Sequence, residues 1–318
     1  MGELAGIDLG GTNIKFGLFS GKGDLLKQWS VSTDLREEGA FLWRQIADEI
    51  KNNAEPSELE GIGLGIPGPV LPDGFVESCV NLHLRNFNPA EKMREYFPGM
   101  KIRAANDANV AALGEQWKGA GQGHRNLAMV TLGTGVGGSV IQEGKIIDGT
   151  NGLGGEFGHV QINAEETEIC NCGGKGCLDQ AASASGIVRY AGKFLRESSQ
   201  ASVLRGKEIF TAKDVLEAAR NQDRIAEKTV EYCMNFLAKV LAMVSYVVDP
   251  EVFIIGGGVS NAGDYLIEMI QKLYEPYITL SQKKAKILRA SLGNNAGIYG
   301  AARLVLREED EPPVPEQV

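Results

Sequence analysis

Four potential metal ligands lie in the pattern His-x10-Cys-x-Cys-x4-Cys, namely His159, Cys170, Cys172 and Cys177. Three thiolates and one imidazole suit a tetrahedral Zn²⁺ ion with no open position, which is the coordination of a structural metal. The intervening loop contains three glycines that let it fold tightly around an ion, Gly173, Gly174 and Gly176. The alternatives are three free thiols in a flexible loop or one disulfide. The spacing and the expected cytosolic environment favour zinc.

Two acidic residues flank this cysteine loop in the sequence. Glu156 precedes His159 by three residues, and Asp179 follows Cys177 by two. Carboxylates held rigidly near one another are good acceptors for vicinal hydroxyls, so the pair indicates polyol recognition. The competing interpretation is solvated surface charge, which we adopt for three other glutamates, Glu165, Glu166 and Glu168.

Another candidate carboxylate, Asp107, lies where a predicted strand ends and a predicted helix begins, within Asn106-Asp107-Ala108-Asn109. Open α/β sheets bind ligands at the carboxyl ends of their strands, and a hydroxyl that attacks a γ-phosphate needs a base to accept its proton. The competing interpretation is a helix N-cap, which position alone favours.

A glycine-rich turn occurs twice, 123 residues apart. Residues 4–12 read LAGIDLGGT and residues 127–135 read LAMVTLGTG, in register without a gap. Each turn separates two apolar runs, which predicts a strand, a turn and a strand. Glycines permit φ > 0 and let backbone N–H groups approach an anion, so two such turns would hold a polyphosphate from both sides. The alternative is two ordinary β-hairpins.

The elements that position these residues alternate between strands and helices. In the first half, strands are predicted over 4–8, 14–19, 25–31, 61–66 and 101–105, and helices over 41–50 and 108–118. The second half has a long helix from about 225 to 248, stopped by Pro250, and a buried strand over 252–255. Thr211-x-x-Asp214 predicts a capped helix start. This alternation and the duplication predict an α/β fold of two similar lobes, with ligands bound in the cleft between them.

We expect an N-terminal lobe over 1–118 and a C-terminal lobe over 119–307, connected at the glycine-rich stretch 119–123. A last helix over about 295–306 would pack back on the N-terminal lobe. The tail 308–318, rich in Glu and Pro, is expected to be disordered.

The composition is that of a soluble globular protein, with 318 residues, 43% hydrophobic and 23% charged. The net charge of −9 argues against a nucleic-acid groove but not against ATP, because a phosphate site needs only local donors. No apolar run reaches the ~18 residues of a membrane span, and no signal peptide precedes the first strand. We therefore expect a cytoplasmic protein without nucleic-acid or membrane partners. Neither Cys79 nor Cys233 has cysteine neighbours, and Cys233 is expected in the core.

Taken together, these motifs resemble the ROK family of sugar kinases and repressors, from Leu4 to about Leu306. DLGGTNIK resembles the first phosphate motif of the family and TLGTGVGGS the second. GGEFGH, followed by CNCGGKGCLD, resembles the family signature and its zinc segment. NDANVAALGE resembles the segment that bears the catalytic aspartate.

The resemblance implies a two-lobed actin-like ATPase (ribonuclease H-like) fold with a duplicated core and a zinc loop. It implies that Asp107 is the catalytic base and that His159 binds zinc through one nitrogen and the sugar through the other. The implied sugar ligands are Asn81, Asn106, Asp107, Glu156, His159 and Asp179. The implied nucleotide-binding residues are Asp8 (through Mg²⁺), Gly10, Gly11, Thr12, Asn13, Lys15, Gly133, Thr134, Gly135, Gly256, Gly257 and Gly258. The family usually has Glu where this chain has Asp179, and it usually has Pro before the residue at Asn81.

The motifs look most like the glucokinase branch of the family. This implies transfer of the ATP γ-phosphate to the 6-hydroxyl of glucose, with ATP, Mg²⁺ and structural Zn²⁺ as cofactors, and a homodimer. Kinases of N-acetylmannosamine, N-acetylglucosamine, fructose and allose share most of the motifs. Family repressors carry a helix-turn-helix domain before the first phosphate motif, which begins here within ten residues of the start. A chaperone-like or cytoskeletal ATPase of the same superfamily would not need Asp107, Glu156 and a zinc loop.

Overall fold

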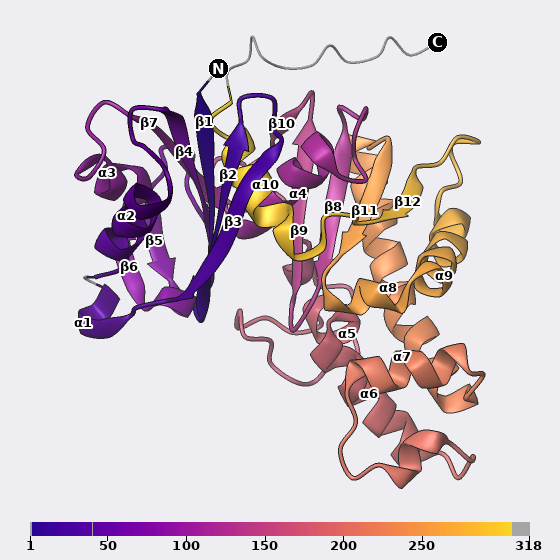
Figure 1. Ribbon diagram of the computed structural model, residues 1–318. Helices are drawn as coiled ribbons and strands as arrows, with labels where there is room; N and C mark the ends of the chain where they lie inside the picture. Colours follow the sequence, from indigo (N-terminus) through magenta and orange to yellow (C-terminus); the bar gives the residue numbers. More distant parts are fainter. Residues whose placement is uncertain (1, 40, 307–318) are drawn as a thin grey trace. The chain divides into compact units, whose positions relative to one another are not determined.

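The structure is a computed structural model that describes residues 2–39 and 41–306. The chain forms two compact units (Figure 1). Of the described residues, 2–125, 144–154 and 291–306 belong to unit 1, and 126–143 and 155–290 belong to unit 2. The tail predicted over 308–318 lies outside the described residues.

This division differs from the boundary that the sequence predicts at 118/119. Residues 119–123, expected as the connection, belong to unit 1, because two of their backbone amides donate to the Glu115 carbonyl and close the end of a helix. Segments 144–154 and 291–306, expected in the second lobe, also belong to unit 1. The chain passes between the units four times, at 125/126, 143/144, 154/155 and 290/291.

Unit 1 is built on a five-stranded sheet. Its strands lie in the order β3 (Leu25–Ser32), β2 (Asn13–Ser20), β1 (Glu3–Leu9), β4 (Leu59–Ile66) and β7 (Lys101–Asn106). The first three form the antiparallel meander predicted from the sequence, whereas β1, β4 and β7 are parallel. The carboxyl ends of the parallel strands therefore meet at one edge of the sheet, where open α/β folds bind ligands.

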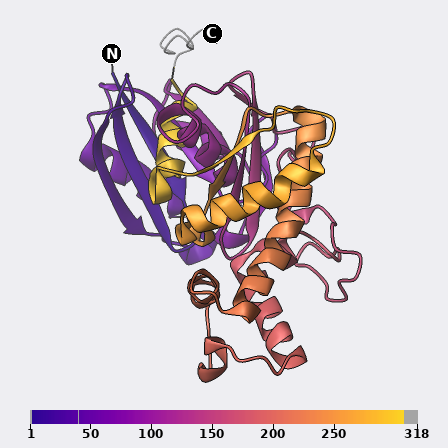
Figure 2. The ribbon, with the colours of Figure 1, turned by 90° about the vertical axis from the view of Figure 1, so that its right-hand side faces the viewer.

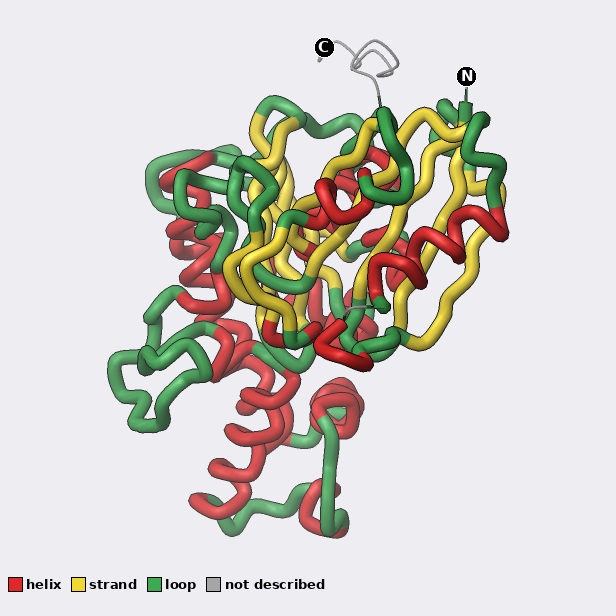
Figure 3. The backbone as a smooth tube through the Cα atoms, turned by 90° about the vertical axis from the view of Figure 1, so that its left-hand side faces the viewer, coloured by secondary structure: helices red, strands yellow, loops and turns green. Residues whose placement is uncertain are grey.

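Helices cover both faces of this sheet. On one face, α2 (Leu42–Asn53) and α3 (Pro89–Arg94) share a hydrophobic cluster with the strands, and Figure 3 shows a helix lying across them. On the other face, α10 (Ala296–Arg303) approaches β4 closely, because a Cβ on Gly63 would lie 1.7 Å from the Ala301 carbonyl oxygen. α4 (Asp107–Lys118) packs on α10 through glycines of both helices. The smaller elements are α1 (Arg36–Gly39), β5 (Val76–Cys79), β6 (Leu84–Phe87) and β10 (Lys145–Ile146).

Unit 2 repeats the strand order of unit 1. β9 (Val136–Gln142), β8 (Leu127–Leu132), β11 (Val252–Gly256) and β12 (Lys286–Arg289) are successive neighbours. β8 and β9 form an antiparallel hairpin, and β8, β11 and β12 are parallel. The hairpin corresponds to β1–β2, and the next two strands correspond to β4 and β7. This confirms the duplication predicted from the two glycine turns.

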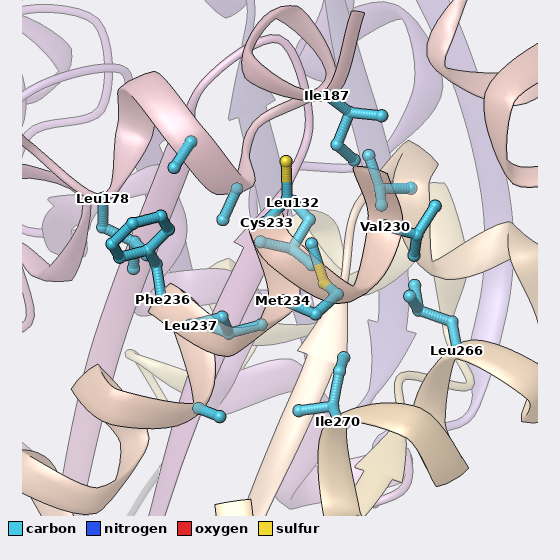
Figure 4. Packing of buried hydrophobic residues seen from close by; sticks show 14 of the residues in the cluster. Leu132, Leu178, Ile187, Val230, Cys233, Met234, Phe236, Leu237, Leu266 and Ile270 are labelled. Atoms are coloured by element: carbon cyan, nitrogen blue, oxygen red, sulfur yellow. The ribbon is translucent and has the colours of Figure 1, made fainter. Parts of the chain in front are cut away.

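The core of unit 2 forms around α8 (Arg224–Val248), the long helix predicted from the sequence. The Asp223 side chain caps its first turn, and Asp249, with a left-handed φ of 44°, ends it before Pro250. Figure 4 shows Cys233 among apolar side chains, fully buried as predicted. Around α8 lie α5 (Asp179–Ala182), α6 (Ala184–Glu197), α7 (Ala212–Arg220) and α9 (Asp264–Tyr274), and Figure 2 shows α8 and α9 from another side.

By length and composition α8 is apolar enough to cross a membrane. This differs from the sequence prediction, because a few polar residues interrupt its apolar run without removing the overall apolar character. In the structure, 56% of its apolar window is buried, which is the environment of a core helix. The predicted cap of α7 is confirmed, since Thr211 and Asp214 each accept a hydrogen bond from the other's backbone N–H.

Candidate active site

The carboxyl edge of the unit 1 sheet gathers several predicted site residues. Asp8 lies at the end of β1, and Asn106 and Asp107 lie at the junction of β7 and α4. Because these strands are parallel and both pair with β4, their ends share one edge. This edge of the sheet therefore carries two carboxylates, those of Asp8 and Asp107, and the Asn106 amide.

Asn106, not Asp107, is the N-cap of α4. Its Oδ1 accepts from the amides of Ala108 at 2.8 Å and Asn109 at 3.2 Å, and its Nδ2 donates to the Gly68 carbonyl at 3.0 Å. The N-cap interpretation of Asp107 is therefore wrong. Asp107 is the half-buried first residue of α4, at the end of the helix dipole that favours a negative charge.

Cys79 and Asn81 belong to the same region. Burial raises the pKa of the Cys79 thiol, and the charge of Asp107 raises it further. Asn81 lies in a short 3₁₀ turn directly after β5, with its side chain exposed. Its carbonyl oxygen lies 2.8 Å from the position of a Cβ on Gly11. The first glycine turn and Asn81 are therefore in contact.

The backbone of the two glycine turns is not left-handed at the glycines from which the sequence predicts it. Neither Gly10 nor Gly133 has a positive φ, so the φ > 0 expected at these positions is wrong. A Cβ on Gly10 would lie 2.7 Å from the Asn13 carbonyl oxygen, and one on Gly135 would lie 2.8 Å from Asp179 Oδ1. At Gly133 the nearest atom would be 3.8 Å away, which is ordinary contact. Close approach therefore explains glycine at Gly10 and Gly135, whereas Gly133 has room for a Cβ.

Beside the first turn, Asp8 and Lys15 form an ion pair. Lys15 Nζ lies 3.2 Å from Asp8 Oδ2 and 3.1 Å from the Asn294 carbonyl oxygen. The backbone at Gly297 packs directly on the Asp8 carboxylate, since a Cβ there would lie 2.6 Å from Asp8 Cγ. The segment that enters α10 therefore supports both charged groups. The turn itself is exposed over Gly11, Thr12 and Asn13.

Asp179 is bound to the second glycine turn. Its Oδ1 accepts a hydrogen bond from the Val136 amide at 2.6 Å. The start of α6 holds the other side of this turn, because the Ala184 amide donates to the Gly133 carbonyl at 2.8 Å and Ser185 Oγ donates to the Thr134 carbonyl at 3.0 Å. Sequence reasoning did not find this contact, because 43 residues separate Asp179 from Val136.

The four predicted zinc ligands come together in unit 2. The donor atoms of His159, Cys170, Cys172 and Cys177 all lie within 4.8 Å of one another. The sulfurs of Cys172 and Cys177 are 3.6 Å apart, close to the roughly 3.8 Å between tetrahedral ligands at ~2.3 Å from Zn²⁺. Burial and the neighbouring thiols raise the pKa of Cys177 to about 12, so a cation is needed to hold all the sulfurs as thiolates. Both the donor set and its spacing fit zinc.

Glu156 directly precedes a short 3₁₀ turn, Phe157–His159, which ends at His159 and packs on β9. Phe157 is buried in the core, and a Cβ on Gly158 would lie 2.1 Å from the Val136 carbonyl oxygen. Glu156 is half-buried, and Nδ1 of His159 is the nitrogen that faces Cys170, at 3.9 Å.

Glu166 is not the solvated surface charge expected from the sequence. Its side chain is only 5% exposed and pairs with Arg189 of α6, while the Tyr190 hydroxyl donates to it at 3.2 Å. Burial is the largest influence and would raise the pKa of Glu166, but the hydrogen bonds from Arg189, the Glu168 amide and Tyr190, together with the charge of Arg189, outweigh it and lower the pKa to about 2. Glu166 thus anchors the cysteine loop to α6. Glu165 and Glu168 are exposed, as predicted.

A pocket of about 670 Å³ lies within unit 2 beside the second glycine turn. It extends from Gly133 and Thr134 to α7 and to Gly258, the last residue of the predicted glycine triplet. Gly257 has a φ of 79°, so this triplet does need glycine for its backbone. Sequence reasoning missed the α7 side of the pocket, although the capping box located the start of that helix. The missed lining residues include Thr211, Lys213, Glu217, Arg220 and Asn261.

The predicted site residues thus form one group in each unit. Unit 1 holds Asp8, Gly10, Gly11, Thr12, Asn13, Lys15, Asn81, Asn106 and Asp107. Unit 2 holds the second turn, Glu156, the four zinc ligands, Asp179 and the triplet Gly256, Gly257 and Gly258.

Two α/β units with the same strand order, each with a glycine turn in its first hairpin, define the actin-like ATPase fold. Within this class the chain belongs to the ROK family, whose model matches residues 4–308. A glucokinase of Halalkalibacterium halodurans is 38% identical over 96% of this chain and 95% of its own length. An N-acetyl-D-glucosamine kinase of Histophilus somni is 31% identical over 96% of this chain and 99% of its own.

Among solved structures, the chain resembles a ROK family glucokinase from Streptomyces griseus in complex with glucose and AMPPNP. The TM-score is 0.76 at 32% identity, covering 95% of this chain and 99% of that one.

Proposed function

We propose that this protein is an ATP-dependent glucokinase that transfers the γ-phosphate of ATP to the 6-hydroxyl of glucose. The observation that carries the proposal is the 38% identity to a glucokinase along nearly the whole chain, together with a site that contains the residue types this reaction needs. Phosphoryl transfer depends mainly on positioning and on neutralising charge. The residues of this chain can be assigned to those two tasks.

The donor side consists of the two glycine turns and the pocket of unit 2. A volume of about 670 Å³ suits a nucleoside, and the pocket continues directly into the turn at Gly133, where backbone N–H groups would bind phosphate oxygens. Gly256–Gly258 would flank the adenosine. In unit 1, the exposed turn residues Gly11–Asn13 and the Lys15 ammonium would bind phosphate.

Mg²⁺ neutralises the charge of the transferring phosphates when it is bound with ATP. Carboxylate oxygens are the ligands that Mg²⁺ prefers, and the Asp8 carboxylate, 20% exposed at the carboxyl edge of the sheet, is the group that would hold it. The Lys15 ammonium beside it would neutralise part of the negative charge of the same phosphates.

On the acceptor side, Asp107 would accept the proton of the 6-hydroxyl. The helix cap is already made by Asn106, so capping does not explain a carboxylate at Asp107. Asn81, Asn106, Glu156 and His159 would bind the other hydroxyls of the ring. Asp179 was expected among them; we propose instead that its main task is to hold the second glycine turn, because its Oδ1 is already bonded there.

Zn²⁺ would be bound by His159, Cys170, Cys172 and Cys177, whose donor atoms fit a tetrahedral ion. Zinc in such a closed site supplies structure and no chemical step. It would fix the loop that begins at Glu156, and through His159 Nδ1 it would orient the imidazole so that Nε2 faces the sugar.

The main alternative is phosphorylation of another hexose, and the 31% identity to an N-acetyl-D-glucosamine kinase favours that substrate as the second candidate. A DNA-binding repressor is disfavoured by the net charge of −9. A cytoplasmic location, expected from the sequence, and a homodimer, implied by the family resemblance, stay predictions that cell fractionation and light scattering would test.

A hexose screen with ATP and Mg²⁺, reading ADP release, tests the function. We expect glucose to give the highest kcat/KM and ATP hydrolysis without sugar to be far slower. Turnover with an N-acetylated hexosamine but not with glucose would replace the glucokinase assignment by the second candidate. The absence of stimulation by any sugar would show that the kinase assignment is wrong.

A further inference from the structure

Glu115, near the end of α4, is a completely buried carboxylate that plays no part in the site described above. Its Oε2 accepts hydrogen bonds from the Ala120 amide at 2.8 Å, the Ser291 amide at 3.1 Å and the Ser291 hydroxyl at 3.3 Å. Its Oε1 accepts from the Leu292 amide at 2.8 Å. All of these donors are uncharged, so the carboxylate is held by hydrogen bonds that converge from two separate segments.

Both segments adjoin places where the chain passes between the units. Residues 119–120 precede the first passage at 125/126, and residues 291–292 directly follow the last passage at 290/291. The glycine-rich stretch noted in the sequence has a physical role here. A Cβ on Gly119 would lie 2.0 Å from Glu115 Oε2, so only glycine lets the chain pass this close to the carboxylate.

The second segment leads to the phosphate-binding side of unit 1. After Leu292 the chain reaches Asn294, whose carbonyl binds Lys15, and then Gly297, which packs on the Asp8 carboxylate. The same α4 that carries Glu115 begins at Asp107. One buried carboxylate therefore connects the helix that starts at the proposed base with the segment that supports the proposed Mg²⁺ and phosphate residues.

We propose that Glu115 is a positioning residue that fixes the outgoing and returning segments of the chain to α4, and thereby holds Asp107 in register with Asp8 and Lys15. The catalytic part of this inference rests on the proposed kinase activity, whereas the structural part does not.

Amide hydrogen exchange of the intact protein, followed by mass spectrometry, tests the structural part. Glu115→Gln keeps the shape but presents an NH₂ group to at least one of the N–H donors, and a lost charge-assisted bond should speed local opening roughly tenfold or more. We expect faster exchange in peptides that cover 119–121 and 290–293, with β1 and β4 unchanged. Glu55→Gln, which removes an exposed charge from unit 1, is the matched control and should change neither region.

Ser291→Ala gives a milder test if Glu115→Gln folds poorly, because it removes only the hydroxyl donor. It should speed exchange in the same two regions by a smaller factor. Unchanged exchange in 119–121 and 290–293 in both variants would overturn the proposal. So would faster exchange throughout unit 1, which would indicate general destabilisation.

Kinetics test the catalytic part. We expect kcat at saturating glucose and ATP to fall roughly tenfold in Glu115→Gln, well below its unfolding temperature, while bound zinc stays at the wild-type level. A wild-type kcat in a variant that opens locally would overturn the positioning role. If the wild-type protein phosphorylates no sugar, the proposed function fails, but the exchange result still decides whether Glu115 fixes the two segments.

Discussion

The Asp179 carboxylate lies 2.6 Å from the backbone amide of Val136 and accepts its hydrogen bond. This contact joins the residue after the cysteine loop to the turn between β8 and β9. The same Oδ1 atom would lie 2.8 Å from a Cβ on Gly135, so a larger residue at 135 would push the carboxylate away from its position. Asp179, which stands where the family usually has the longer Glu, thus has a hydrogen-bond partner within unit 2, the Val136 amide.

Two substitutions of Asp179 separate turn support from sugar binding. Asp179→Ala removes the acceptor for Val136, and we expect KM for ATP to rise about tenfold or more, since a charge-assisted bond contributes roughly 1.5–3 kcal/mol. Asp179→Asn keeps an acceptor oxygen and should raise KM for ATP only a few-fold. Steady-state kinetics with each substrate varied would check this. A rise in KM for glucose alone would restore the role of sugar ligand.

The two glycines of the second turn should differ in their tolerance of a methyl group. Gly135→Ala places a Cβ against Asp179 Oδ1, whereas Gly133→Ala meets nothing closer than 3.8 Å. We expect ATP affinity, measured by calorimetry, to fall at least about tenfold in Gly135→Ala and distinctly less in Gly133→Ala, because only the first methyl group displaces the Asp179 carboxylate that accepts the Val136 amide. Equal losses would indicate that phosphate contact, not packing, decides both positions.

The sequence predicts the fold well because its signals are local. Apolar runs ended by glycine turns define β1–β2 and β8–β9, and their repetition predicts the duplicated sheet order. The capping box at Thr211 and the apolar face of α8 are equally local. Segment 291–306 was expected in the second lobe, with its last helix packing back on the first. Its position in unit 1 depends on packing against Gly63 and on the bonds of Glu115, between residues more than 170 positions apart.

Contacts between distant residues also limit what the sequence predicts about the candidate site. The four residues of the metal-ligand cluster follow from their spacing, but the spacing does not reveal that Glu166 is buried or that α7 lines the pocket beside the second glycine turn. At Gly10 the residue type alone suggested a positive φ, which is wrong. Glycine is needed there because the backbone of Asn13 approaches too closely for a Cβ.

Zinc removal should affect the sugar side of the site. Cys172→Ser removes one of four ligands, so metal analysis should find the zinc content falling from about one per chain to well below it. We expect glucose affinity to fall together with zinc, because the loop that the metal closes includes Glu156 and His159. Calorimetry with glucose would measure this. Full glucose affinity in the metal-free variant would contradict the link between metal and sugar.

The Glu166–Arg189 pair should make stability depend on pH. The pKa of Glu166 is about 2 in the folded protein, below its ordinary value of 4.5, so its contribution is present above pH 4.5 and is lost as the pH falls toward 2. We expect Glu166→Gln to lower the free energy of unfolding by about 1–3 kcal/mol at pH 7 and by less near pH 3. Urea unfolding at both pH values measures this.

The matched control for that measurement is Glu197→Gln on α6, the helix that carries Arg189. Glu197 forms an exposed ion pair with Lys193 at 4.0 Å, for which we expect less than about 0.5 kcal/mol. Similar losses in the two variants would show that Glu166 is no more important than a surface charge.

Asp107→Asn tests the chemical step itself. The substitution removes the proton acceptor but leaves the helix cap, which Asn106 supplies, so kcat should fall by at least ~10² with little change in stability. Asn106→Ala should instead cost about 1 kcal/mol of unfolding free energy through the lost cap and, because Asn106 is also a proposed sugar ligand, raise KM for glucose. Thermal unfolding and steady-state kinetics of both variants separate the roles. A wild-type kcat in Asp107→Asn would exclude Asp107 as the base, and the proton of the 6-hydroxyl would then have to leave to another acceptor.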